Sequence, residues 1–315
     1  MIYKKVGAFE VSNVVLGGAN FGSVIDEKNS FALMDTFVDR GGNCIDTARL
    51  YGFTGKSEAC IGRWLAANPD KREKLVISTK GGHPELKTMD VSRLGKKELE
   101  SDLDESLSAL GVDCIDIYWL HRDDEAILAG EIIETLNGFI RKGKIKSIGA
   151  SNWKSSRVIE ANRYAKEKGL SPFVATQVQW SLAHINEGTY DPTTTAMTDE
   201  EYEVYSKTEL SAFAFSSQAM GIFSLLEKGG EEALTGAVRK FYLNDITLKR
   251  YDRALSLAKK YGMPISSVIM SYVYSDYNIS AHVLIGPNNT ELLLDSITNP
   301  NLILTSEEIM WLKNG

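Results

Sequence analysis

Four side chains have types and spacing that suit proton transfer at a carbonyl oxygen. Short apolar segments end at Asp46, Lys80 and His121, and Tyr51 follows Asp46 after one short loop. A lysine ammonium near a phenol favours the ionised phenol, and a carboxylate keeps that lysine charged and in place. A histidine can donate a hydrogen bond to a carbonyl oxygen and orient it. If the three segments are neighbouring strands, these groups converge on one site.

The elements that would position them recur along the chain. Eight short apolar segments have the composition of strands buried on both faces. They cover residues 14–18, 43–46, 75–79, 115–120, 145–150, 175–180, 210–215 and 282–286. Segments with helical periodicity lie between them, and one cycle takes roughly 30–40 residues. This alternation predicts an α/β fold, a (β/α)8 TIM barrel, which we expect to form one domain over residues 1–315.

The stretch before the first predicted helix, residues 3–17, has a glycine turn between two alternating runs. This pattern predicts an N-terminal β-hairpin that closes the barrel floor. The longest strand-free intervals, residues 181–209 and 216–281, follow the sixth and seventh predicted strands. In a barrel, such insertions lie at the carboxyl ends of the strands, where active sites form.

Composition and charge narrow the class of protein. The formal net charge is −7 at pH 7, and the sequence contains no cluster of basic residues large enough to bind nucleic acid. Both observations argue against a nucleic-acid partner. We find no apolar run long enough for a membrane span, and the first residues lack the apolar stretch of a signal peptide. The cysteines, Cys44, Cys60 and Cys114, have no metal-ligand spacing. We therefore expect a cytoplasmic protein with reduced cysteines and no metal site.

Three segments resemble the signature of the aldo-keto reductase family. They are IDTARLYG around Asp46 and Tyr51, ISTKGG around Lys80, and IYWLH ending at His121. The resemblance extends over essentially the whole chain. It implies an NAD(P)-dependent oxidoreductase that interconverts a carbonyl compound and an alcohol, with Tyr51 as the proton donor.

The same resemblance implies a cofactor site. Ser151, Asn152 and Gln177 would hold the nicotinamide carboxamide, and Phe215 would stack on the nicotinamide ring. The loop over the pyrophosphate would begin after Phe215, and the adenosine phosphate would lie beyond the eighth strand. The residues implied for these two parts are Ser216, Ser217 and Met220, and then Gly286, Asn288, Leu292 and Ser296.

Three of these positions depart from the family pattern. Leu292 stands where the family has Arg or Gln, and Ser296 stands where it has the Asn that contacts adenine. Many members have Arg or Lys near the 2′-phosphate of NADP, where this chain has Asn288. A neutral donor binds phosphate about half as strongly as a charged one, which weakens a preference for NADP. NADP(H) remains the expected cofactor and NAD(H) is the alternative. Lys228 or Arg239, from the long seventh loop, could supply the missing charge.

Other interpretations remain open at this stage. Asp46 could cap a turn, and His121 alone could be structural. We expect His83, His184 and His282 to be structural or loop residues, since they lack metal-ligand spacing. Residues 122–124 form either a solvated loop or polar contacts for a hydroxylated substrate.

Two other functions also fit parts of the sequence. One is a cofactor-binding regulatory subunit of the kind associated with potassium channels. The other is a barrel lyase that forms a Schiff base on Lys80. The expected partner is a small-molecule carbonyl compound, and neither its identity nor the oligomeric state follows from the sequence.

Overall fold

The computed structural model describes residues 1–315, apart from the side chain of Thr54. Eight parallel strands close into a barrel in the order β10-β3-β4-β5-β6-β7-β8-β9. Their bounds are β3 (Val14–Gly17), β4 (Cys44–Asp46), β5 (Val76–Gly81), β6 (Ile115–Leu120), β7 (Ile145–Ser151), β8 (Phe173–Gln179), β9 (Ser211–Phe215) and β10 (Ala281–Ile285). The predicted TIM barrel is confirmed, and each strand lies within about two residues of its predicted segment.

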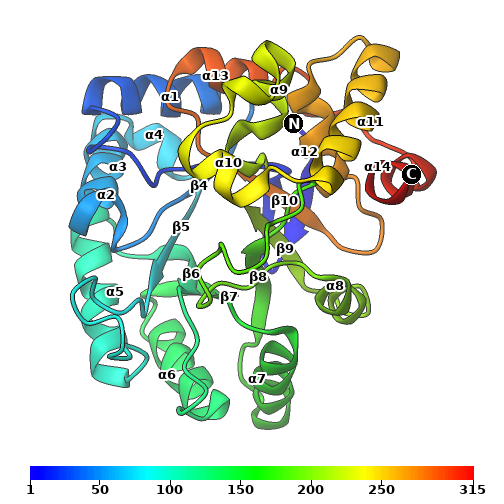
Figure 1. The fold of residues 1–315 in the computed structure, drawn as a ribbon. Coiled ribbons are helices and arrows are strands. Elements are labelled where there is room, and N and C mark those ends of the chain that lie inside the picture. The colour runs from blue at the N-terminus through cyan, green and yellow to red at the C-terminus, as the bar shows by residue number, and fades with distance from the viewer.

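Helices surround the strands on the outside of the barrel (Figure 1). The longer ones, such as α1, α5, α6 and α7, bury one apolar stripe in the core, as their 3.6-residue periodicity predicts. The helices are α1 (Glu27–Asp39), α2 (Tyr51–Thr54), α3 (Lys56–Ala67), α4 (Pro69–Arg72), α5 (Lys96–Leu110), α6 (Ala129–Arg141), α7 (Ser155–Lys168), α8 (Asp199–Tyr205), η1 (Ala219–Gly221), α9 (Ile222–Gly229), η2 (Gly230–Ala233), α10 (Gly236–Tyr242), α11 (Asp245–Tyr261), α12 (Ile265–Tyr274), α13 (Thr290–Ser296) and α14 (Ser306–Asn314). Within the described part of the chain, none of these helices is both long and apolar enough to cross a membrane.

The apolar core has two layers. The larger layer lies between the strands and the helices, and the smaller one fills the barrel interior. Within the interior, the rings of Trp119 and Phe213 meet edge to face, with centroids 5.0 Å apart. Gly149, on the neighbouring strand β7, leaves the room that Trp119 needs, since a Cβ there would lie 2.2 Å from the indole. The barrel is therefore packed with side chains and has no open channel through it.

The predicted N-terminal hairpin is confirmed. Its strands, β1 (Tyr3–Val6) and β2 (Phe9–Ser12), pair antiparallel. Val6 and Val11 belong to the interior core layer, so the hairpin covers one end of the barrel. That end is the amino end of the strands, because the Lys5 carbonyl accepts a hydrogen bond from Ser211 Oγ, at the start of β9. The site must then open at the opposite end, at the carboxyl ends of the strands.

Candidate active site

A buried ion pair joins the ends of two neighbouring strands. Asp46 is the last residue of β4, and Lys80 lies near the end of β5. The Lys80 ammonium contacts the Asp46 carboxylate and donates to the Thr47 carbonyl at 2.7 Å. Burial by itself would lower the pKa of Lys80, but the charge of Asp46, and then Tyr51, raise it above its ordinary value. The lysine is therefore held as an ammonium ion.

Tyr51 lies directly over this ammonium. Lys80 Nζ is 4.6 Å from the centroid of the Tyr51 ring. The next residue, Gly52, has φ +69°, and a Cβ there would lie 2.8 Å from the Ser57 backbone nitrogen. Only glycine fits such a turn without strain. The chain therefore turns sharply directly after Tyr51, the first residue of α2, whose ring lies over Lys80.

His121 is the fourth member of the cluster and follows β6 directly. Its ring meets that of Tyr51 at 5.5 Å between centroids and an interplanar angle of 84°. Burial, followed by the charges of Lys80 and Arg122, lowers the pKa of His121 well below its ordinary value, so the ring is neutral at pH 7.

The proton of the neutral His121 ring can be assigned. Nδ1 is buried and has no hydrogen-bond partner among the described residues. A neutral imidazole carries one N–H, and an N–H at Nδ1 would have no acceptor. The hydrogen therefore belongs on Nε2, which leaves this nitrogen as a donor toward any group placed beside Tyr51.

His83 is a fifth ionisable group at the site, and the sequence analysis did not predict it. We expected a structural or loop residue. Its ring instead lies 4.8 Å from that of His121, at 69°, and lines the same cavity as Tyr51. The available signal was its place three residues beyond Lys80, at the same strand end. Gly81 and Gly82 lie between Lys80 and His83. Because the direction of the chain after two glycines does not follow from the sequence, the side chain of His83 could not be placed at the site.

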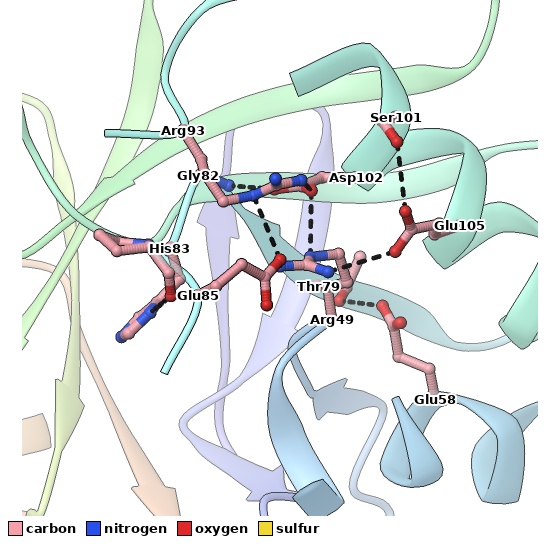
Figure 2. A network of polar contacts seen from close by, with 11 residues as sticks. Arg49, Glu58, Thr79, Gly82, His83, Glu85, Arg93, Ser101, Asp102 and Glu105 are labelled. Carbon is pink, nitrogen blue, oxygen red and sulfur yellow. Dashed lines mark hydrogen bonds and ion pairs between the residues drawn. The ribbon is translucent and has the colours of Figure 1, made fainter. Parts of the chain in front are cut away.

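A network of charges lies behind the cluster and ties its loops together (Figure 2). The Arg49 guanidinium, two residues before Tyr51, contacts the carboxylates of Glu85 at 2.6 Å, Asp102 at 3.0 Å and Glu105 at 3.2 Å. Asp102 is fully buried on α5 and also accepts from the Gly82 backbone N–H at 2.8 Å. The network therefore connects the loop that carries Tyr51 with the loop that carries His83.

Two cavities open at this end of the barrel. The smaller, of about 380 Å³, is lined by Asp46, Tyr51 and His121, whereas Lys80 is fully buried and does not line it. The larger, of about 610 Å³, adjoins it and shares Ser216 and other residues with it. Among the described side chains, no cluster of three or more His, Cys, Asp or Glu residues is arranged to hold a metal ion.

Every residue that the sequence assigned to cofactor binding lines one of these cavities. The smaller cavity is lined by Ser151, Asn152, Gln177, Phe215, Ser216 and Gly286. The larger one is lined by Ser216, Ser217, Met220, Gly286, Asn288, Leu292 and Ser296. Some are held by the chain itself: Gln177 donates to Asp46 at 3.2 Å, and Ser217 donates to the Leu284 carbonyl at 2.7 Å. The residues implied for the two ends of the cofactor are thus separated into two joined cavities.

Comparison with known proteins identifies the family of the chain. The model of the aldo/keto reductase family matches residues 13–314. The chain belongs to the aldo/keto reductase family. It is 31% identical to an aryl-alcohol dehydrogenase of Pestalotiopsis microspora, over 97% of this chain and 79% of that protein. It is 28% identical to an uncharacterised oxidoreductase of Bacillus subtilis, over 96% of this chain and 92% of that protein.

Comparison with solved structures finds the same fold in an aldo-keto reductase. A crystal structure of a thermostable aldo-keto reductase, solved with the inhibitor epalrestat, superposes with a TM-score of 0.77 and 22% identity, over 99% of each chain. The predicted family membership is confirmed, and this member of the aldo/keto reductase family is an NAD(P)-dependent oxidoreductase.

Proposed function

We propose that the enzyme interconverts a small carbonyl compound and its alcohol at the cavity beside Tyr51, with Tyr51 as the proton donor. The observation that carries this proposal is the buried Lys80–Asp46 ion pair, packed against the Tyr51 ring and beside a neutral His121. A phenol above a fixed ammonium can release its proton, because the phenolate left behind is stabilised by the adjacent positive charge.

The roles of the side chains follow from their contacts. His121 Nε2 donates a hydrogen bond to the carbonyl oxygen and holds it within reach of the Tyr51 hydroxyl. Tyr51 gives its proton to this oxygen as negative charge develops there. Lys80 stabilises the phenolate, and Asp46 keeps Lys80 charged and in position. In the oxidative direction, the Tyr51 phenolate accepts the proton of the alcohol.

The residues of the two cavities fit a nicotinamide dinucleotide. The cavities join at Ser216, Leu284 and Gly286, which gives an elongated site with the catalytic cluster at one end. Amide and hydroxyl groups, which suit a carboxamide, line that end at Ser151 and Asn152. When bound, the reduced nicotinamide supplies the hydride that the carbonyl carbon receives.

For the cofactor we propose NADP(H), with NAD(H) as the alternative. In the larger cavity, Asn288 is a neutral residue where many family members have a phosphate-binding cation. Its side-chain oxygen lies 3.5 Å from Asn20 Nδ2. Lys228 is the cation that lines this cavity, together with the acidic Glu227 and Asp295. Lys228 therefore supports binding of a 2′-phosphate, and the two carboxylates oppose it.

The contacts of Lys80 favour this proposal over a Schiff-base lyase. A Schiff base needs a neutral amine, whereas the Asp46 partner and the raised pKa of Lys80 keep it protonated. Borohydride in the presence of a carbonyl compound should therefore leave Lys80 unmodified, as mass spectrometry of the peptide would show.

Nicotinamide fluorescence during separate titrations with NADPH and NADH tests the cofactor. Saturable binding of either supports the proposal, and the ratio of the two dissociation constants tests the effect of Asn288. Turnover by Tyr51→Phe, compared with wild type, then tests the proton donor. We expect a loss of kcat of at least about a hundredfold with cofactor binding retained, and full activity would rule out the role of Tyr51.

We further propose that residues 1–315 act as one barrel domain, in the cytoplasm, on a small-molecule carbonyl compound and without a nucleic-acid or membrane partner. Cys44, Cys60 and Cys114 are all free thiols, which suits a reducing compartment. The net charge of −7 is unfavourable for binding nucleic acid or an acidic membrane surface.

A further inference from the structure

Two polar side chains in the catalytic cavity have no part in the proton transfer proposed above. His83 and Arg122 both line the cavity that Tyr51 and His121 line. Each is largely buried and each is held in one orientation by its neighbours. Fixed polar groups beside a reacting centre usually determine which substrate fits there.

His83 presents a hydrogen-bond acceptor. Its Nδ1 lies 2.6 Å from the Pro84 carbonyl oxygen, and because a carbonyl oxygen only accepts, Nδ1 carries the hydrogen. Burial, and then the charge of Arg122, lower the pKa of His83, which keeps the ring neutral. Nε2 is therefore an unprotonated acceptor, and no described residue donates to it. Figure 2 shows the imidazole directed away from the Arg49–Asp102 network.

Arg122 presents donors only. Its guanidinium donates to the Thr193 hydroxyl at 3.0 Å, to the His121 carbonyl at 2.9 Å and to Asp191 at 3.4 Å. A guanidinium has more N–H groups than these contacts use. Among the described side chains, Asp191 is the one carboxylate within salt-bridge distance of Arg122, and 46% of its side chain is exposed, which weakens the pairing. An acceptor on the substrate would satisfy the remaining donors.

A hydroxyl group is the substituent that matches both partners, because it accepts from a guanidinium and donates to a neutral imidazole at the same time. A carboxylate would accept from Arg122 but has no hydrogen to donate to His83 Nε2. An alkyl group would displace water from both side chains and form no hydrogen bond with either. The His83 ring contacts that of His121, which holds the carbonyl oxygen in the proposed function. The hydroxyl must therefore lie close to the carbonyl.

We propose that His83 and Arg122 recognise a hydroxyl on the carbon next to the reacting carbonyl, so that the substrate is a 2-hydroxyaldehyde or 2-hydroxyketone. This inference rests on the proposed function. It makes His83 and Arg122 specificity-determining residues, separate from the proton-transferring cluster of Asp46, Tyr51 and Lys80.

Steady-state reduction of 2-hydroxypropanal, propanal and 2-methoxypropanal by the enzyme tests this inference. For the wild type, we expect kcat/KM for 2-hydroxypropanal to exceed that for propanal and for 2-methoxypropanal by about tenfold or more. Neither of these two analogues can donate a hydrogen bond to His83, which leaves a buried polar group unpaired. In His83→Phe, which keeps a ring beside His121 but removes the acceptor, the ratio should fall to about one. His184→Phe, at an exposed histidine outside both cavities, should keep the wild-type ratio.

The outcomes separate the inference from the proposed function. Reduction of all three aldehydes at similar efficiency by the wild type would overturn the inference and leave the proposed function standing. A ratio in His83→Phe equal to that of the wild type would also overturn it. Reduction of none of them with either nicotinamide cofactor would count against the proposed function, and the inference would fall with it. If His83→Phe does not fold, Arg122→Met tests the donor half, with the same loss of preference for 2-hydroxypropanal expected.

Discussion

The Arg49 guanidinium lies 3.0 Å from the carboxylate of Asp102, a residue on α5 that lines neither cavity. Asp102 also accepts from the Gly82 N–H (Figure 2). A single buried carboxylate therefore contacts Arg49, two residues before Tyr51, and Gly82, directly before His83. The position of the proton donor therefore depends on a helix that lines neither cavity.

Asp102→Asn should impair both stability and catalysis. Asp102 also forms an ion pair with Arg93, so Arg49 and Arg93 would both lose their buried partner. Breaking such a pair costs about 3–5 kcal/mol in the free energy of unfolding. A displaced Tyr51 should lower kcat about tenfold or more, with the cofactor dissociation constant little changed. Urea unfolding and steady-state kinetics measure the two effects. Lys142→Met, which removes an exposed pair with Glu100 on the same helix, is the control and should cost less than about 1 kcal/mol.

Variants of the Lys80–Asp46 pair should show that the free energy of unfolding and the catalytic activity change independently. Lys80→Met leaves a buried carboxylate unpaired and should destabilise the protein by about 3–5 kcal/mol. Adding Asp46→Asn removes that charge and should restore much of the stability. Activity should stay low in both variants, because Tyr51 has lost its ammonium. A double variant that regains turnover along with stability would contradict the role of Lys80.

Acid should destabilise the protein partly through His282. Burial lowers the pKa of this histidine to about 4, whereas in the unfolded chain it titrates near 6.5. Between those values the unfolded state binds more protons, so the free energy of unfolding decreases as pH falls through this window. His282→Asn keeps an N–H for the Ser12 carbonyl and removes the titration. Its free energy of unfolding should fall less than that of the wild type from pH 7 to pH 5, by about 2 kcal/mol, and parallel curves would refute the prediction.

The barrel interior should be intolerant of added volume at Gly149. A methyl group there would meet the Trp119 indole at 2.2 Å and the Ala175 carbonyl at 3.1 Å. We expect Gly149→Ala to cost about 1–3 kcal/mol or more in denaturant unfolding. Gly138→Ala, on the helix α6, meets only the end of Arg141 at 3.9 Å and should instead stabilise by about 0.5–1 kcal/mol. Equal effects of the two changes would show that the indole can move aside.

The strands were predictable because burial on both faces leaves a strong mark on the sequence. Segments such as 115–120 consist of residues that are all buried in the structure. The convergence of Asp46, Lys80 and His121 followed from the same reasoning, since adjacent parallel strands end at one edge. The residues proposed for the cofactor came from resemblance, because loop residues such as Ser217 carry no periodic signal.

What could not be predicted depends on loops and on contacts between distant segments. Arg49 and Asp102 are separated by more than fifty positions, and nothing local marks them as partners. His83 follows two glycines, and Gly82 has φ +74°. A glycine can adopt this conformation, but its presence in a sequence does not require it. Such positions are determined by tertiary packing, which one sequence does not display.

The closure of the barrel has a consequence for how the protein is made. β10 fills the gap between β9 and β3, with Val283 opposite Val14. A ribosome delivers residues 281–285 last among the strands, so until then β3 and β9 expose unpaired backbone groups. Such open edges recruit strands from other chains. Biosynthesis therefore carries an aggregation hazard until its final stage, and protection by a chaperone should matter most for chains stalled shortly before β10.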